Sequence, residues 1–247
     1  MTENPVVSAT DIDYEYGPVS VLRGLSLAIE AGTVVAVVGP NGGGKSTLLQ
    51  TLAGVATPTS GTVKYPATGD IHPVGYLPQS FHPRADLTVV ETVAYYDRLA
   101  GTGPTPKTLV DQVGLGAVAN RRVRALSGGM RRLLGVAVAA AGDPELLVLD
   151  EPTSGLDRTM TRRVFDQCHS LATDDRSVVI ATHDLPAVEE VADRALLLDR
   201  GRLRLDRQLP IRDAAFATAY DRAVDGEITV RSGREDRDDD STGGVRS

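Results

Sequence analysis

Apolar and polar residues alternate in two stretches near the start of the chain, 6–14 and 25–29. A period of two predicts half-buried antiparallel strands, and Gly17 with Pro18 between them predicts a turn. The stretch 61–65 has the composition of a further strand. These segments predict an antiparallel β subdomain at the N-terminus.

Continuous apolar runs occupy 34–38, 146–149 and 177–181. Such runs are typical of parallel strands that are buried on both faces. Helical patterns follow the first two runs, at about 46–53 and 158–171. The order of these elements predicts an α/β fold with a mainly parallel sheet.

The pattern changes after a further predicted strand at 74–78. Several helical patterns and few strand signals predict an α-helical subdomain, at about 86–141, that is inserted into the α/β core. We expect one domain over 5–225. The remainder, 226–247, is acidic and poor in apolar residues, so we expect a disordered tail.

Composition limits the classes of function. The chain has 247 residues, 41% of them hydrophobic, and a net charge of −7 with a pI near 5.1. Since nucleic acids select basic surfaces, no nucleic-acid partner is expected. The single cysteine, Cys168, rules out an internal disulfide. No targeting signal or apolar run of membrane-spanning length is visible, so we expect a soluble, cytoplasmic protein.

The segment 39–47 matches the pattern G-x-x-x-x-G-K-[ST] directly after a predicted strand, and it predicts a phosphate-binding cradle. Its glycines allow several backbone N–H groups to point at a triphosphate. Lys45 would reach the β- and γ-phosphates, and the Ser46 hydroxyl would bind Mg²⁺. The predicted nucleotide-binding residues here are Gly39, Pro40, Asn41, Gly42, Gly43, Gly44, Lys45, Ser46 and Thr47.

Two adjacent carboxylates, Asp150 and Glu151, stand at the end of the apolar run 146–149. Open parallel sheets bind ligands at the carboxyl ends of their strands. Asp150 would help to hold Mg²⁺, directly or through a water. Glu151 would then be the general base that accepts a proton from the attacking water.

A second candidate anion site is formed by Ser127, Gly128 and Gly129, which precede a helical run. Taken with the other motifs, it carries a family resemblance. The chain from about 6 to 215 is similar to ATP-binding-cassette (ABC) transporter ATPases, in which the same motifs occur in the same order. The motifs are the cradle, Leu126-Ser127-Gly128-Gly129, Asp150-Glu151-Pro152, Ser154-Gly155-Leu156-Asp157 and Thr182-His183-Asp184.

The resemblance implies a P-loop NTPase core that binds ATP and Mg²⁺ and hydrolyses ATP. In that family two cassettes enclose two ATP molecules head to tail, so the cradle of one chain faces Ser127, Gly128 and Gly129 of a second copy or of a homologous cassette. Separate membrane-spanning permease subunits are the other implied partners. They would hold the chain at the inner face of the cell membrane.

The resemblance also implies roles for single residues. Gln79 would touch Mg²⁺ and the attacking water and would lie where the cassette meets the membrane subunit; His183 would bond the γ-phosphate. Asp157 would lie in the loop that communicates between the two nucleotide sites. Tyr16, beside a glycine, is the preferred residue for stacking on adenine, and Tyr14 is the alternative.

Met130 and the segments 87–92 and 95–101 resemble the branch of the family that serves exporters with separate membrane chains. The alternatives are the ATPase of an importer, a non-transport ABC ATPase of repair or translation, and a module that binds ATP without hydrolysing it. Repair ATPases need long heptad arms between cradle and signature, and the span 48–125 has none. Gly43, where alanine is frequent in the family, would loosen the free loop.

Overall fold

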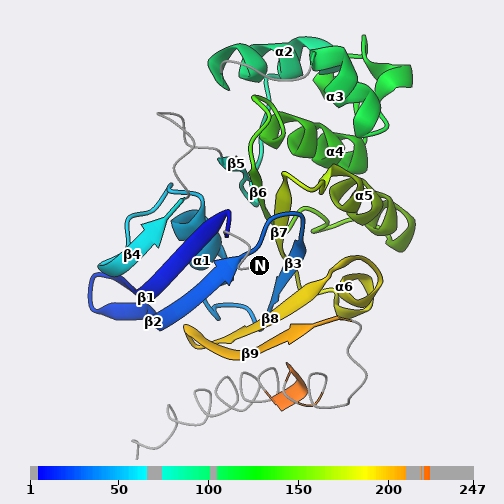
Figure 1. Ribbon diagram of the computed structural model, residues 1–247. Coiled ribbons are helices and arrows are strands. Elements are labelled where there is room, and N and C mark those ends of the chain that lie inside the picture. Colours follow the sequence, from blue (N-terminus) through cyan, green and yellow to red (C-terminus); the bar gives the residue numbers. More distant parts are fainter. Residues whose placement is uncertain (1–4, 66–73, 101–104, 210–217, 219, 223–247) are drawn as a thin grey trace, which may run out of the picture.

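A mainly parallel sheet crosses the centre of the protein, and the computed structural model describes residues 5–65, 74–100, 105–209, 218 and 220–222 (Figure 1). Within these residues the sheet has six strands in the order β5-β6-β7-β3-β8-β9. All neighbours are parallel except β8 and β9, which form an antiparallel hairpin. The strands are β3 (Val34–Val38), β5 (Val74–Leu77), β6 (Leu146–Asp150), β7 (Ser177–Ala181), β8 (Arg194–Asp199) and β9 (Arg202–Gln208).

A second sheet, antiparallel, lies beside the first and is drawn in blue and cyan in Figure 1. Its strands have the order β2-β1-β4 and are β1 (Val7–Tyr16), β2 (Val19–Ile29) and β4 (Ser60–Lys64). Gly17 and Pro18 form the turn between β1 and β2, as the sequence predicted. This sheet is the expected N-terminal β subdomain.

Helix α1 (Lys45–Leu52) packs between the two sheets and contacts both. Leu48, Leu49 and Leu52 are fully buried in one cluster with Val35 and Val37 of β3 and with apolar residues of β1 and β2. Since alternate residues of a strand point to opposite faces, the other residues of β3 meet a different layer. That layer contains α5 (Arg158–Leu171) and α6 (Leu185–Val191). The central strands are therefore buried on both faces.

Three helices gather at one end of the molecule, drawn in green in Figure 1. They are α2 (Val89–Ala100), α3 (Pro106–Gln112) and α4 (Gly128–Ala139). Two single turns of 3₁₀ helix, Gly116–Val118 and Val123–Ala125, lie between α3 and α4. Ser127 caps α4, since its hydroxyl accepts a hydrogen bond from the N–H of Met130 at 3.2 Å. None of the described helices combines the length and the apolar character needed to cross a bilayer.

The predicted α/β P-loop fold, with its antiparallel β subdomain and its helical insertion, is confirmed. The predicted strands at 34–38 and 177–181 have the observed bounds. Both β8 and β9 were missed, although the apolar run of β8 and the alternation of leucine with arginine in β9 are strand signals. The predicted tail, 226–247, lies outside the described residues.

The packing of α5 against the sheet generates a stability prediction. Phe165 is 1% exposed in the large cluster formed by this helix, the helical region and the sheet. Phe165→Ala should lower the free energy of unfolding by about 3–5 kcal/mol, because it removes buried apolar surface and leaves a cavity. Leu99→Ala, at a residue 69% exposed, is the control and should change it by less than about 0.5 kcal/mol. Equal midpoints in urea for both variants would contradict this packing.

Candidate functional site

The predicted phosphate cradle is the turn between β3 and α1. The buried strand ends at Val38. The turn begins at Gly39, whose φ of 150° is accessible mainly to glycine, and closes at Gly44 with a φ of 103°. Gly44 is the N-cap residue of α1 and makes no side-chain cap, so the first N–H groups of the helix are available for other acceptors. The geometry is that of an anion site at a helix N-terminus.

Lys45 lies inside this turn and is only 7% exposed. Its Nζ donates hydrogen bonds to the carbonyl oxygens of Gly39 at 2.8 Å and Pro40 at 3.0 Å. Two backbone carbonyls thus hold a buried ammonium group within the loop. A positive charge in this place, together with the helix N-terminus, favours a polyanion.

Asp150 ends β6 and is 2% exposed. Ser46, the second residue of α1, donates a hydrogen bond from Oγ to Asp150 Oδ1 at 3.1 Å. Burial raises the pKa of Asp150, while the hydrogen bond from Ser46 opposes that shift and the charge of Glu151 adds to it. A hydroxyl and a carboxylate side by side are hard oxygen donors of the kind that Mg²⁺ prefers.

Glu151 follows at once and has a φ of 49°, in the left-handed region that is uncommon for a residue other than glycine. Its N–H donates to the carbonyl of Ala181, at the end of β7, at 3.1 Å. Its Oε2 lies 3.0 Å from Nδ1 of His183, which stands two residues beyond that strand. Two residues predicted to be catalytic are therefore in contact, although 32 positions separate them in the sequence.

A pocket of about 340 Å³ opens at the cradle. It brings together predicted residues from three segments, since Gln79, after β5, and Glu151, after β6, share it with the cradle. Val21 of β2 also lines it and was missed, because it belongs to no motif and reads as an ordinary strand residue. The lining residues are Val21, Asn41, Gly42, Gly44, Lys45, Ser46, Thr47, Gln79 and Glu151.

The two candidate tyrosines differ in exposure. Tyr16 is 53% exposed at the end of β1, opposite the 60%-exposed Val19 in the register with β2. Tyr14 is partly buried and packs against the cluster beneath the sheet. Their ring centroids are 4.9 Å apart. An aromatic face open to a ligand is therefore offered by Tyr16 rather than by Tyr14.

The remaining predicted residues lie outside the cradle pocket. Ser127 and Gly128 are exposed at the start of α4, and Gly129 is buried there. Asp157 caps α5, accepting a hydrogen bond from the N–H of Met160 at 2.9 Å. Within one chain, the structure does not bring the serine-glycine motif or Asp157 to the wall of the pocket that holds Lys45.

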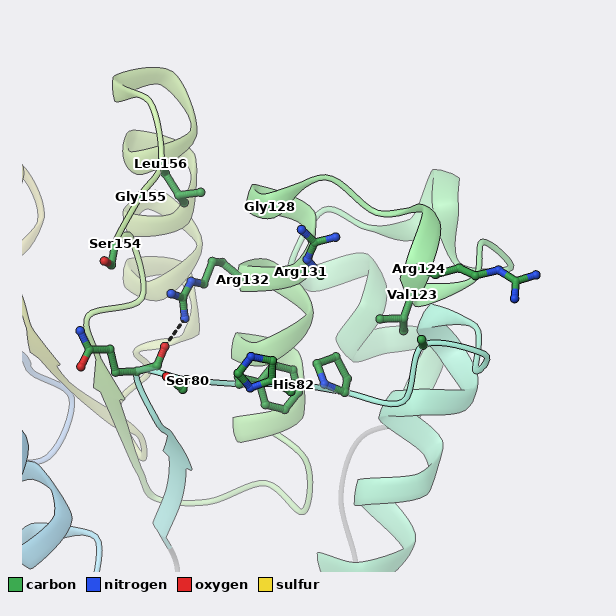
Figure 2. A pocket seen from close by; sticks show the side chains of 14 residues that line it. Ser80, His82, Val123, Arg124, Gly128, Arg131, Arg132, Ser154, Gly155 and Leu156 are labelled. Carbon is green, nitrogen blue, oxygen red and sulfur yellow. Dashed lines mark hydrogen bonds between the residues drawn. The ribbon is translucent and has the colours of Figure 1, made fainter.

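A larger groove, of about 590 Å³, lies between the segment after Gln79, the start of α4 and the loop before α5 (Figure 2). Arg132 of α4 donates a hydrogen bond from Nη1 to the carbonyl of Gln79 at 2.7 Å. Among the described residues that line the groove are three arginines and a histidine but no carboxylate, and one of these arginines, Arg124, donates a hydrogen bond to Asp86 Oδ1 at 2.7 Å. The lining residues are Gln79, Ser80, Phe81, His82, Pro83, Ala85, Val123, Arg124, Gly128, Arg131, Arg132, Ser154, Gly155 and Leu156.

The chain is similar to known ATP-binding proteins of transporters in sequence and in fold. A relative called Nod factor export ATP-binding protein I, from Ralstonia nicotianae, is 33% identical over 210 residues, which is 80% of this chain but only 65% of that protein. A solved ABC transporter in an inward-facing conformation is 28% identical, with a TM-score of 0.75, covering 89% of this chain and 90% of that chain. A dimeric structure of a bacterial ABC transporter cassette has a TM-score of 0.72 at 24% identity, covering 82% and 98%, and shows the shared fold.

The family model described as ABC transporter matches residues 22–154. That region is more than half of the chain. It begins in β2, beside the cradle pocket, and runs through the cradle, the helical region and the carboxylate pair to the start of the loop before α5. The chain therefore belongs to the ABC transporter family, as an ATP-binding cassette.

Proposed function

We propose that this chain is the ATP-hydrolysing subunit of a membrane transporter, with one ATPase domain over 5–225, and that the transporter works as an exporter. One observation carries the hydrolytic part of the proposal. Glu151, in contact with His183, shares a single pocket with the phosphate cradle, so a base lies beside the position of a triphosphate.

ATP would be bound at both of its ends. The triphosphate would lie in the turn 39–44 and against the N-terminus of α1, with Lys45 exchanging its two carbonyl partners for phosphate oxygens. Adenine would stack on the exposed ring of Tyr16. Val21 of β2, which lines the pocket, would form its apolar wall.

The donor set fits Mg²⁺. Ser46 Oγ and Asp150 Oδ1 are adjacent, and Gln79 lines the same pocket. Among the described residues no group of three or more His, Cys, Asp or Glu side chains could hold a metal ion, which agrees with an ion that takes its other ligands from phosphate and water. When bound, Mg²⁺ neutralises charge on the β- and γ-phosphates. Burial disfavours the ionised form of Asp150 and so raises its pKa, and a cation bound to the carboxylate would offset that cost.

The catalytic roles follow from position. Glu151 would accept the proton of the attacking water, and His183 would keep the carboxylate in place and contact the γ-phosphate. Lys45 would stabilise the negative charge that is transferred. Gln79, which lines the same pocket, would help to position the water.

The complete site would need two chains. Ser127, Gly128 and Asp157 are exposed and lie away from the pocket of their own chain, as expected for groups that meet the nucleotide of a partner. The dimeric cassette of the same fold supports a dimer, and the proposed arrangement is head to tail with a second copy or a homologous cassette. Each nucleotide would then be enclosed between the cradle of one chain and the start of α4 of the other.

The groove beside Gln79 would receive a membrane-spanning subunit. Arg132 ties the carbonyl of Gln79 to α4, so a contact in the groove can reach the pocket through one residue (Figure 2). Arg124 is already paired with Asp86, but Arg131 and Arg132 donate hydrogen bonds to backbone carbonyls, so their charges would favour a segment that carries acidic side chains. The name of the Ralstonia relative supports export as the direction of transport.

The role of the base gives the first test of this function. Glu151→Gln keeps the size of the side chain but removes its basicity, so steady-state phosphate release should fall by about 10²–10⁴-fold. ATP binding should persist, and ATP should trap the dimer in size-exclusion chromatography. Glu190→Gln, on exposed α6 surface, is the matched control and should hydrolyse ATP normally. Normal turnover by the Glu151 variant would refute the assignment of the base.

Mixing two inactive variants tests whether the site is shared. Lys45→Ala should inactivate the cradle and Gly128→Asp should inactivate the surface that faces the partner. A mixed dimer retains one site in which both halves are intact, so an equal mixture should recover about a quarter of the native rate if chains pair at random. Each variant alone should stay inactive. No recovery in the mixture would argue for a site completed within one chain.

The groove assignment predicts a separation of binding from hydrolysis. His82→Glu puts a negative charge among the arginines and should weaken capture of the membrane subunits from detergent extracts of the native cells, because an acidic partner would be repelled. Phosphate release by the isolated chain should stay near the native rate. His169→Glu, exposed on α5, is the control and should capture the same membrane proteins as the unmodified chain. Equal capture by both variants would contradict docking in the groove.

A further inference from the structure

The hairpin of β8 and β9 ends in a two-residue turn, Arg200-Gly201. Both residues have positive φ, 49° and 75°, as in the type I′ turns that connect antiparallel strands. Asparagine, aspartate or glycine usually occupies the first position of such a turn, so arginine there is a residue in an unfavourable conformation. Arg200 is exposed, whereas Gly201 is buried.

Gly201 is buried because it is wedged between the cradle and β2. Its N–H donates to the carbonyl of Gly43 at 3.0 Å, and its own carbonyl accepts from the N–H of Arg23 at 3.0 Å. A Cβ atom at this position would lie 2.1 Å from the carbonyl oxygen of Val21. Real Cβ atoms do not approach backbone so closely, so only glycine fits without a shift of β2 or of the turn.

The strand that leads into this turn supports the cradle as well. A Cβ at Gly39 would lie 2.0 Å from the carbonyl oxygen of Leu198, and one at Gly43 would lie 3.0 Å from the same atom. The N–H of Gly43 donates to the carbonyl of Pro40 at 3.1 Å, so Gly43 is hydrogen bonded on both sides. The loosening expected at Gly43 is thus opposed by two backbone hydrogen bonds, one of them from Gly201.

We propose that Gly201 is a positioning residue for nucleotide binding, acting through the carbonyl of Gly43 and the backbone of Val21. Neither Gly43 nor Gly201 lines the cradle pocket, whereas Val21 does. Gly201 therefore binds the carbonyl oxygen of Gly43 outside the pocket. This hydrogen bond keeps the partial negative charge of that oxygen away from the phosphate oxygens of the ligand. Gly201 also fixes the wall that Val21 contributes. The inference rests on the proposed binding of ATP in the cradle.

A matched pair of substitutions tests this role. Gly201→Ala and Gly24→Ala both place alanine at positive φ, 75° and 57°, but the added Cβ meets Val21 only at position 201 and has nothing within 4 Å at position 24. Dissociation constants for MgATP should be measured by calorimetry, with kcat and KM from phosphate release. Gly201→Ala should raise the dissociation constant and KM by about tenfold, equivalent to about 1.4 kcal/mol, with a smaller change in kcat. Gly24→Ala should leave both near native.

Equal dissociation constants for the native chain and Gly201→Ala would overturn the positioning role, as would equal weakening by Gly24→Ala. If the native chain itself binds no MgATP, the proposed function fails first, and the two failures are thereby distinguished.

Hydrogen–deuterium exchange provides a measurement on the unmodified chain, in case Gly201→Ala does not fold. The N–H of Gly201 can exchange only when its bond to Gly43 opens. Saturating MgATP should therefore slow deuterium uptake at the turn 199–203 together with uptake in the cradle. Slower exchange in the cradle with unchanged exchange in the turn would overturn the proposal.

Discussion

Parallel pairing of β3, β6 and β7 is the constraint on which the site depends. These strands are neighbours in the sheet and run in the same direction, so their carboxyl ends meet at one edge. The cradle leaves β3, the carboxylate pair leaves β6, and His183 follows β7. Burial of the strands on both faces fixes their register, and the register brings Glu151 within 3.0 Å of His183.

Burial of charge gives this edge its chemical character. Lys45, Asp150 and Glu151 are each less than a tenth exposed, and each has a specific polar partner that lowers the cost of removing it from water. Groups held in this way need little reorganisation when a ligand with the complementary charges arrives. The left-handed backbone of Glu151 is the local strain that accompanies this arrangement.

The β8–β9 hairpin, at the edge of the sheet next to β3, and the groove near α4 are two different supports of the same pocket. One holds the cradle from outside through backbone contacts of Gly201 and Leu198, and the other reaches Gln79 through Arg132. Gly201 and Arg132 do not line the cradle pocket, but each contacts a residue that does, Val21 and Gln79 respectively. A nucleotide pocket assembled from loops is thereby connected to two separate surfaces of the protein.

The sequence by itself determined the α/β class, the cradle and the carboxylate pair, because these depend on local patterns: apolar runs, glycines at fixed spacing and charges at strand ends. The sequence also favoured Tyr16 over Tyr14, and the structure agrees in that Tyr16 is the more exposed ring. Tertiary structure alone decided that Val21 lines the pocket and that Gly201 supports the cradle. Val21 and Gly201 take part in the site through contacts with residues that are far away in the sequence. Such contacts leave no spacing or periodicity in the sequence, since packing between separate strands and loops sets them.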